Sequence, residues 1–416
     1  MTESNEKKIL ILGGGFAGVK CALELQKKGL GNVKITLVSD RPHFEYHGAL
    51  YRLVAGHSPL EVCIPINQII DEKRVDFSVD TIVSIDPGSH EAKGESGSVY
   101  QYDTLVIALG AETNFFNIPG LKEYSFGMKT ISNALALKRH IHEVIESCIK
   151  GTKADNLCAG NFVVVGGGAT GVEIAAELAV YTKKLAKIHG IEPTLMNVEL
   201  LEAGARILPI LPVSFTGRIE EKIRSLGVNV LLNRAIEKSD IENAYLNDMQ
   251  LKTKTVIWTA GVRANHLIEE AGFPIQKTGK AEVDEHMHIK GHGDIFVSGD
   301  AAATDLSGMA QTALYDGEYI ADVIEAELLG RQPRTYSPRQ PIYAIPAGPG
   351  WAGTLLFGSL KTYGKLGWFL RRVVDMVVFL SLLPPKKAFE AFGSHKQTCE
   401  ACPVCCAYEE KYAGSL

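Results

Sequence analysis

The chain has 416 residues, of which 46% are hydrophobic and 22% charged, with a formal net charge of −5. At about 150 residues per domain, this length predicts two or three domains with cores of their own. The composition excludes a mainly disordered chain. The absence of a basic excess argues against nucleic acid as a partner.

The N-terminal residues Met1 to Lys8 are polar and lead directly into an apolar run, so we find no secretory signal peptide here. A reducing, cytoplasmic setting is therefore expected, without a framework of disulfides. The 8 cysteines are unevenly distributed. Four are scattered, and four crowd the C-terminal end: Cys399, Cys402, Cys405 and Cys406.

The first predicted strand, Lys8 to Leu12, is an apolar run that breaks at a glycine turn. Residues 17–28 then show helical spacing of apolar side chains, and residues 33–38 form the next strand. The turn reads G-x-G-x-x-G. In a dinucleotide site, Gly13 makes the turn, Gly15 lets the backbone approach a pyrophosphate, and Gly18 allows close packing. Asp40 is the acidic residue expected to bind a ribose, and the alternative is that the preceding Ser39 occupies this position.

The same pattern of strand, glycine turn, helix and strand recurs at residues 161–201. Its loop runs from Gly166 through Gly168 and Thr170 to Gly171, and its second strand is followed by Glu202. An acid at that point suits an adenosine ribose and repels a 2′-phosphate, so NADH is favoured over NADPH.

Two such units predict an α/β fold with two nested, doubly wound (Rossmann-like) dinucleotide-binding domains. Further strands are expected at residues 104–108, 255–259 and 294–297. Two dinucleotide sites in one chain suggest a tightly held flavin and an exchangeable nicotinamide, with hydride passing from the second to the first.

Several segments resemble the type II NADH dehydrogenases, the single-subunit flavoprotein NADH:quinone oxidoreductases. They include Val163 to Leu178 (VVVGGGATGVEIAAEL), Val256 to Arg263 (VIWTAGVR) and Phe296 to Ala303 (FVSGDAAA). The stretches Tyr46 to Gly56, Ser58 to Pro65 and Leu105 to Gly110 are also similar, so the resemblance covers about residues 8–324.

The resemblance implies FAD on the first glycine loop and NADH on the second. It places Glu173 beside the nicotinamide and the reactive edge of the flavin, and Asp300 on the ribityl chain. The other residues expected to bind the cofactors are Phe16, Ala17, Ala108, Gly110, Gly261, Gly299 and Ala301.

Four parts of the chain are expected. Residues 1–120 and 291–345 would form a discontinuous FAD-binding domain, and residues 121–290 an NADH-binding domain. Residues 346–390 would form a C-terminal helical segment that associates with the membrane or with a second copy in a homodimer. Residues 391–416 would be the cysteine-rich tail.

Asp300 and Glu173 each have a simpler interpretation. Asp300 stands between a strand and a helix, where it either accepts a hydroxyl group or caps the turn. Glu173 either complements the dipole of its helix or handles protons near the flavin. Because hydride transfer needs no protein base, we interpret Glu173 as a positioning and proton-handling residue.

The sequence leaves the electron acceptor open, because the quinone-site pattern A-Q-x-A-x-Q-Q of the family is altered here. The chain keeps Gln311 but has Tyr315 and Asp316 in place of the glutamine pair. These three residues are the candidate quinone contacts. The alternatives are a sulfide:quinone oxidoreductase, a flavin reductase with a soluble acceptor, and a non-enzymatic redox sensor that acts through the cysteine tail. A disulfide reductase is disfavoured because no C-x-x-x-x-C is present.

Leu366 to Leu383 would span about 27 Å as a helix, slightly less than the roughly 30 Å hydrocarbon core of a bilayer. Arg371, Arg372 and Asp375 near its middle disfavour spanning. An interfacial helix is expected instead, with Trp368 and Phe369 among lipid headgroups and the arginines meeting anionic lipid. Packing against the protein's own core, or against a dimer partner, is the alternative. The expected location is the inner face of the cell membrane, as a peripheral protein.

The four crowded cysteines suit thiolate-bound zinc or an iron–sulfur centre. The alternative is an exposed thiol tail that binds no metal.

Overall fold

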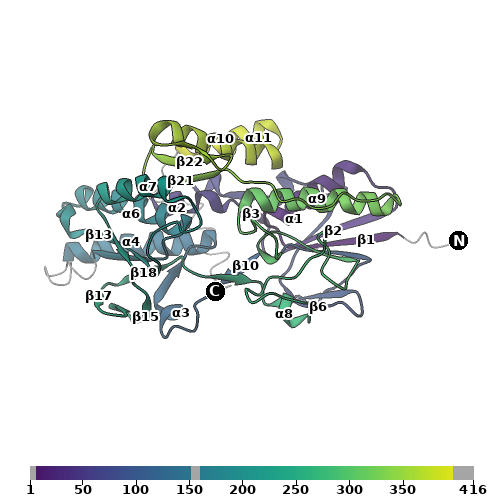
Figure 1. The fold of residues 1–416 in the computed structure, drawn as a ribbon, viewed down its shortest axis with the longest axis horizontal. Helices are drawn as coiled ribbons and strands as arrows, with labels where there is room; N and C mark the ends of the chain where they lie inside the picture. Colours follow the sequence, from purple (N-terminus) through teal and green to yellow (C-terminus); the bar gives the residue numbers. More distant parts are fainter. Residues whose placement is uncertain (1–5, 151–159, 397–416) are drawn as a thin grey trace.

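The computed structural model describes residues 6–150 and 160–396. Two parallel β-sheets lie side by side, each with helices packed against it, and two C-terminal helices lie across the top of the view in Figure 1. The α/β class and the paired dinucleotide-binding units predicted from the sequence are confirmed.

The first sheet contains five parallel strands in the order β20-β9-β1-β2-β5. Ile9 to Leu12 are all buried, as expected for a central parallel strand covered on both faces. The strands are β1 (Lys7–Leu12), β2 (Val33–Ser39), β5 (Asp76–Val79), β9 (Thr104–Ile107) and β20 (Ile295–Val297). Helix α1 (Phe16–Lys28) connects β1 to β2 and ends at Gly29 in the left-handed conformation.

The second sheet repeats this design in the order β11-β18-β12-β13-β14. Its strands are β11 (Ser125–Gly127), β12 (Asn161–Val165), β13 (Asn197–Glu202), β14 (Val228–Leu232) and β18 (Thr255–Trp258). Its main helices are α4 (Ile131–Lys150), α6 (Ala169–Ile188) and α7 (Val213–Ser225).

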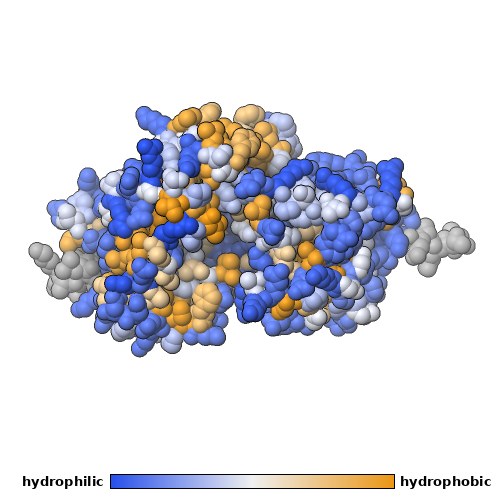
Figure 2. All heavy atoms as spheres, viewed as in Figure 1, coloured by the Kyte–Doolittle hydropathy of each residue, from blue (hydrophilic) through white to orange (hydrophobic). Residues whose placement is uncertain are grey.

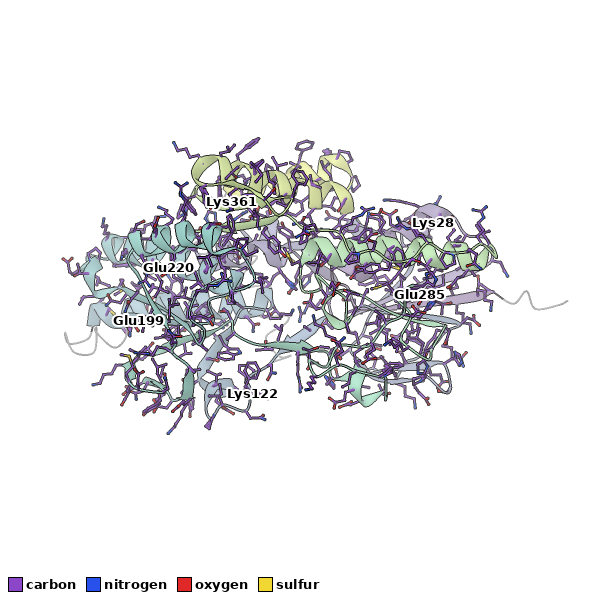
Figure 3. The ribbon with its side chains drawn as sticks, viewed as in Figure 1. Lys28, Lys122, Glu199, Glu220, Glu285 and Lys361 are labelled. Atoms are coloured by element: carbon purple, nitrogen blue, oxygen red, sulfur yellow. The ribbon has the colours of Figure 1, made fainter. Side chains whose placement is uncertain are left out.

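The chain returns to the first sheet after completing the second, because β20 pairs with β9 and α9 (Ala310–Leu328) packs against α1. Gly317 permits this contact, since a Cβ atom there would lie 2.2 Å from the carbonyl oxygen of Ala17. Lys28 lies beside α9 in Figure 3, where its ammonium group contacts Asp322 and Glu325. On this topology we propose the discontinuous division of the chain into residues 1–120 with 291–345, and residues 121–290.

Short elements complete the two units. A two-stranded antiparallel ribbon of β10 (Ala111–Thr113) and β19 (Val262–Ala264) connects them. The others are β3 (His43–Glu45), α2 (Leu50–Val54), β4 (Cys63–Pro65), β6 (Ile82–Asp86), β7 (Glu91–Gly94), β8 (Val99–Gln101), α3 (Leu121–Tyr124), β15 (Ile236–Ser239), β16 (Asn243–Leu246), β17 (Gln250–Lys252) and α8 (Leu267–Glu270).

The C-terminal segment begins with a three-stranded antiparallel sheet that the sequence analysis did not predict. It consists of β21 (Tyr343–Pro346), β22 (Ala352–Leu356) and β23 (Leu360–Thr362). Lys361 on β23 lies close to α7 in Figure 3, and its ammonium group donates to Ser214 Oγ at 2.5 Å. The predicted helix follows as α10 (Gly364–Leu382), and α11 (Pro385–Gly393) ends the segment.

The orientation of α10 corrects one expectation. Arg371, Arg372 and Asp375 face inward, with 5%, 7% and 0% of their surface exposed, so the prediction that these arginines meet lipid is wrong. Trp368 is only half-buried, and its ring lies over the guanidinium group of Arg52. The side of the helix that carries charge is therefore the side packed against the protein, as the alternative interpretation expected.

The outward side of α10 is apolar. Figure 2 shows hydrophobic side chains gathered over the top of the molecule, where α10 and α11 lie. We define the outer stripe as the exposed residues Leu366, Phe369, Val373, Val377 and Leu380 of α10 with Phe389 of α11. Within the described residues, no helix is long and apolar enough to cross a bilayer.

Candidate functional site

The first glycine loop is built so that two glycines are required and a third leaves space. Gly13 has φ +113°, and a Cβ atom there would lie 2.3 Å from the carbonyl oxygen of Ala108. A Cβ atom on Gly18 would lie 2.0 Å from the carbonyl oxygen of Gly13. Gly15, in contrast, faces open space at the start of α1, where no side chain caps the helix. That space and the free N–H groups around it suit a pyrophosphate.

A cleft of about 440 Å³ opens in front of this loop, at the carboxyl ends of the first sheet. The sequence-predicted residues that line it are Gly13, Gly15, Phe16, Ala17, Asp40, Ala108, Gly110, Gly299 and Asp300. Gly18 and Ala301 do not line it and are buried behind its wall. Lining residues that sequence reasoning missed include His47, Lys129, Thr130, Asn133 and Asn265.

Strand register places Ser39, rather than Asp40, at the position expected to bind a ribose in the first unit. Gly13 N donates to the carbonyl oxygen of Val38, the residue before Ser39. In the second unit, Gly166 N donates in the same way to Leu201, the residue before Glu202. Ser39 is therefore the counterpart of Glu202. Asp40 lies one residue further along, exposed at the cleft and paired with Arg41 at 3.2 Å.

Asp300 lies at the far side of the cleft, in the short turn Gly299–Ala301 that follows β20. Its carboxylate lies 3.4 Å from the ammonium group of Lys129. Lys129 precedes α4, 171 positions earlier in the chain, and nothing in its local sequence indicates this contact. A hydroxyl-rich chain in the cleft would therefore meet an acceptor and a donor side by side.

A buried carboxylate supports the floor of the cleft near Phe16. Glu45 contacts Arg41 at 3.1 Å, His43 at 3.5 Å and His47 at 3.6 Å. Burial alone would raise the pKa of Glu45, but hydrogen bonds from the two histidines and the charge of Arg41 hold it well below its ordinary value. Glu45 thus stays ionised and fixes His47 at the cleft edge.

The second glycine loop reproduces the first. Gly166 has φ +111°, and a Cβ atom on Gly171 would lie 1.8 Å from the carbonyl oxygen of Gly166. Gly168 faces open space, and Thr170 beside it is exposed. Glu202 accepts from Gly167 N at 2.8 Å and from Gly204 N at 2.7 Å, which fixes its carboxylate at the loop. Gly261 contributes by packing, because a Cβ atom there would lie 2.4 Å from the carbonyl oxygen of Asn114.

Glu173 is the fifth residue of α6, and Glu177 lies one turn further along the helix. Burial raises the pKa of Glu173 to about 8, although Arg371 and Arg52 oppose the shift. Burial likewise raises the pKa of Glu177 to about 7, opposed by Arg52. Glu173 is therefore largely protonated near neutral pH, whereas Glu177 titrates there. Sequence reasoning identified Glu173 and missed Glu177.

A group of buried ionic residues, which we call the α10 charge cluster, lies next to these carboxyl groups. It consists of Arg52, Glu61, Arg371, Arg372 and Asp375. Asp375 contacts all three arginines and accepts from Tyr46 Oη. Burial alone would raise the pKa of Asp375, but Arg371, Arg52 and Arg372 lower it, so the carboxylate is ionised.

Comparison with known proteins agrees with this geometry. The family model for pyridine nucleotide-disulphide oxidoreductases matches residues 7–317. The type II NADH:quinone oxidoreductase of Staphylococcus haemolyticus is 30% identical over 386 residues, 89% of this chain and 94% of that protein. Its counterpart Ndh from Mycobacterium tuberculosis is 30% identical over 397 residues, 90% and 84% of the two chains. The chain belongs to the type II NADH:quinone oxidoreductases.

Two solved structures show the same fold. NDH2 from Plasmodium falciparum in complex with NADH gives a TM-score of 0.85 at 20% identity, over 94% of this chain and 98% of that one. The sulfide:quinone oxidoreductase of Aquifex aeolicus gives 0.76 at 18% identity, over 99% and 95%. Because an NADH-binding and a sulfide-oxidising protein share this fold, the fold alone does not identify the electron donor.

The three residues predicted as quinone contacts are buried or contact other residues of the protein. Gln311 exchanges two hydrogen bonds with the backbone of Ile342. Tyr315 is largely buried, with the guanidinium group of Arg339 4.1 Å from its ring centre. Asp316 is fully buried, which leaves it no surface on which to meet a quinone. Gln311 and Tyr315 stay predictions as acceptor contacts.

The cysteines give no metal site in the part of the chain that the structure describes. Cys21 and Cys63 are free thiols there, and burial raises the pKa of Cys63 to about 12, so it is unreactive. Cys399, Cys402, Cys405 and Cys406, predicted as candidate ligands, lie outside the described residues. So does Cys158.

Proposed function

We propose that the chain oxidises NADH through a bound FAD and passes the electrons to a membrane quinone. The observation that carries this proposal is the pair of matching glycine loops, one opening on a deep cleft and the other carrying Glu202. FAD would occupy the cleft along Gly13, Gly15 and Asp300, and NADH the loop at Gly166, Gly168 and Glu202.

When bound, the flavin supplies a ring that accepts hydride and releases electrons one or two at a time. The chain's own residues hold and orient the two dinucleotides. The helix N-termini at Gly15 and Gly168 would face the pyrophosphates, and the Asp300–Lys129 pair would bind hydroxyl groups. Glu173, which is protonated at neutral pH, would hold a proton near the reacting atoms for the quinol.

The outer stripe would rest on the membrane surface. Its side chains Phe369 and Val377 are 61% and 60% exposed, and the basic residues Lys386 and Lys387 begin α11 beside them. Apolar side chains with adjacent lysines suit the interface of an anionic bilayer. The protein would therefore act on the inner face of the cell membrane, where its acceptor is dissolved.

Gly15 and Gly168 allow a test of the two cofactor sites, because a Cβ atom at either position meets no other atom of the protein within 4 Å. Gly15→Val fills the space for one pyrophosphate, and Gly168→Val the space for the other. Gly31→Val, at another open glycine outside the cleft, is the matched control. Wild type and the control should be yellow and should bleach with NADH under anaerobic conditions. Gly15→Val should be colourless, whereas Gly168→Val should be yellow and bleach with dithionite but not with NADH.

The acceptor is tested with the reduced protein on liposomes. We expect a ubiquinone or menaquinone in the bilayer to reoxidise the flavin faster than a soluble carrier does. Reduction of the flavin by sulfide, in place of NADH, would assign the chain to sulfide oxidation. A wild-type protein that cannot bind flavin at all would refute the proposal.

A further inference from the structure

Asp316 on α9 joins three segments that are far apart in the chain. Its Oδ2 accepts from the backbone N–H of Gly299 at 3.0 Å, and its Oδ1 accepts from Tyr336 Oη at 2.6 Å. Gly299 begins the turn that presents Asp300 to the cleft, and Tyr336 belongs to the connection between α9 and β21. The carboxyl group is fully buried.

This environment is unusual for an acidic side chain. Both donors are neutral, and within the described ranges no lysine, arginine or histidine forms an ion pair with Asp316. A buried carboxylate without a cation is costly, and an amide would satisfy the same contacts without charge. The buried negative charge of Asp316 therefore needs a functional explanation.

The position of the charge suggests that role. Gly299 has φ +66° and packs against Ala17 and Ala313, which line the cleft with it. Asp316 thus lies directly behind the wall of the cleft, because it contacts Gly299, which lines the cleft. Burial raises the pKa of Asp316 to about 6, Asp300 adds to the shift, and the hydrogen bonds from Tyr336 and Gly299 oppose it. The charge is present at neutral pH and lost in mild acid.

We propose that Asp316 is a positioning residue of the flavin site, which fixes the Gly299–Ala301 turn and places a buried negative charge behind it. This charge disfavours the electron-rich reduced flavin and so lowers its reduction potential. The inference rests on the proposed function, since it takes the cleft to hold a flavin.

The titratable and charged groups around Asp316 come from every element packed against it. The turn contributes Asp300, which is paired with Lys129, and the connection contributes Tyr336. Helix α9 itself contributes Tyr315, beneath Arg339, and Tyr319, beneath Arg334. Helix α1 contributes Lys20, which pairs with Glu24 and Glu318. None of the cations contacts Asp316.

The substitution Asp316→Asn removes the charge and keeps the shape, because the amide oxygen still accepts from Gly299 and the amide nitrogen donates to Tyr336. The flavin midpoint potential is measured by reductive titration against a reference dye at pH 8 and pH 5. At pH 8 we expect the variant to favour reduced flavin about tenfold more than wild type, which is ~30 mV for two electrons. At pH 5 the two potentials should coincide, because wild-type Asp316 is then protonated.

Asp305→Asn is the control, since it removes an exposed carboxylate from the loop before α9 and should leave the potential unchanged. Tyr336→Phe is the second variant, in case Asp316→Asn does not fold. It removes a donor to the carboxylate, so the pH at which the potential changes should move upward.

Equal potentials for wild type and Asp316→Asn at pH 8, or a difference that persists at pH 5, would overturn the inference. An unchanged transition pH in Tyr336→Phe would do the same. These results leave a yellow, NADH-reducible protein and so leave the proposed function standing. A wild-type protein that binds no flavin overturns both.

Discussion

We expect the choice between NADH and NADPH to depend on Glu202. Its carboxylate is fixed by Gly167 N and Gly204 N at the open end of the second glycine loop. A 2′-phosphate there would meet a fixed negative charge. Glu202→Gln should therefore raise kcat/KM for NADPH by about tenfold and lower that for NADH by a similar factor. Glu192→Gln, at an exposed acid of the same unit, should change neither. Unchanged selectivity in Glu202→Gln would remove Glu202 from the site.

Glu173 is the residue whose protonation should shape the pH dependence of turnover. With a pKa raised to about 8 by burial, it carries a proton at pH 7 and loses it as the pH rises through 8. Quinone reduction should fall over that interval in wild type. Glu173→Gln should reduce quinone about 10²-fold more slowly than wild type, and its rate should not fall over this pH interval. Stopped-flow reduction of the flavin by NADH should change little.

The control for this pH profile is Glu221→Gln on α7, an exposed carboxyl group that should leave the profile as it is. If the rate of quinone reduction by Glu173→Gln still falls near pH 8, the fall belongs to the titration of another group. Glu177, with its pKa raised to about 7, is the neighbour to substitute next.

At the scale of the element, α10 has two faces with different tasks. The inner face is fixed by Asp375, which compensates three buried arginines. Asp375→Ala would leave those cations unpaired and should lower the free energy of unfolding by about 3–5 kcal/mol in urea titrations. Asp76→Ala, which breaks the exposed pair of Asp76 with Lys34, should cost at most about 1 kcal/mol. Similar losses in the two variants would show that the cluster contributes little.

The outer face of α10 should bind lipid. Replacing Phe369, Val373 and Val377 together by serine removes the middle of the outer stripe without touching the buried side. We expect co-sedimentation with anionic vesicles to fall by at least tenfold, with NADH oxidation by a soluble acceptor retained. Ile241→Ser, at an exposed apolar residue between β15 and β16, is the control. Unchanged sedimentation, with self-association lost, would assign the stripe to a second copy of the chain.

At the scale of the molecule, sequence reasoning succeeded where the signal was local. The glycine loops and their flanking strands depend on a few adjacent residues, so both units and the glycine-rich part of the cleft wall were predicted. The sequence left Ser39 and Asp40 open as the ribose position of the first unit, and the end of β2 at Ser39 favours Ser39. The α10 charge cluster was missed because its members, such as Arg52 and Asp375, lie 323 positions apart. Each looks like an isolated charge until the fold brings them together.

The cleft also joins the two units, and this leads to a prediction for the whole protein. Its walls include Gly13 and Asp300 from the first unit, Lys129 before α4, Asn133 on α4, and Asn265 after β19. A flavin held there would contact all of these segments in the folded state only. Stripping it should therefore lower Tm, and added FAD should restore it by mass action.

At a hundredfold excess over its Kd, FAD should add about 2.7 kcal/mol to the free energy of unfolding, a rise of several degrees in calorimetry. Gly15→Val should unfold at the temperature of the stripped protein and gain nothing from FAD, because its side chain fills the pyrophosphate space. Gly31→Val should follow wild type. If stripped wild type keeps its full Tm whatever the FAD concentration, the flavin does not bridge the units, and their packing depends on protein contacts such as the β10–β19 ribbon alone.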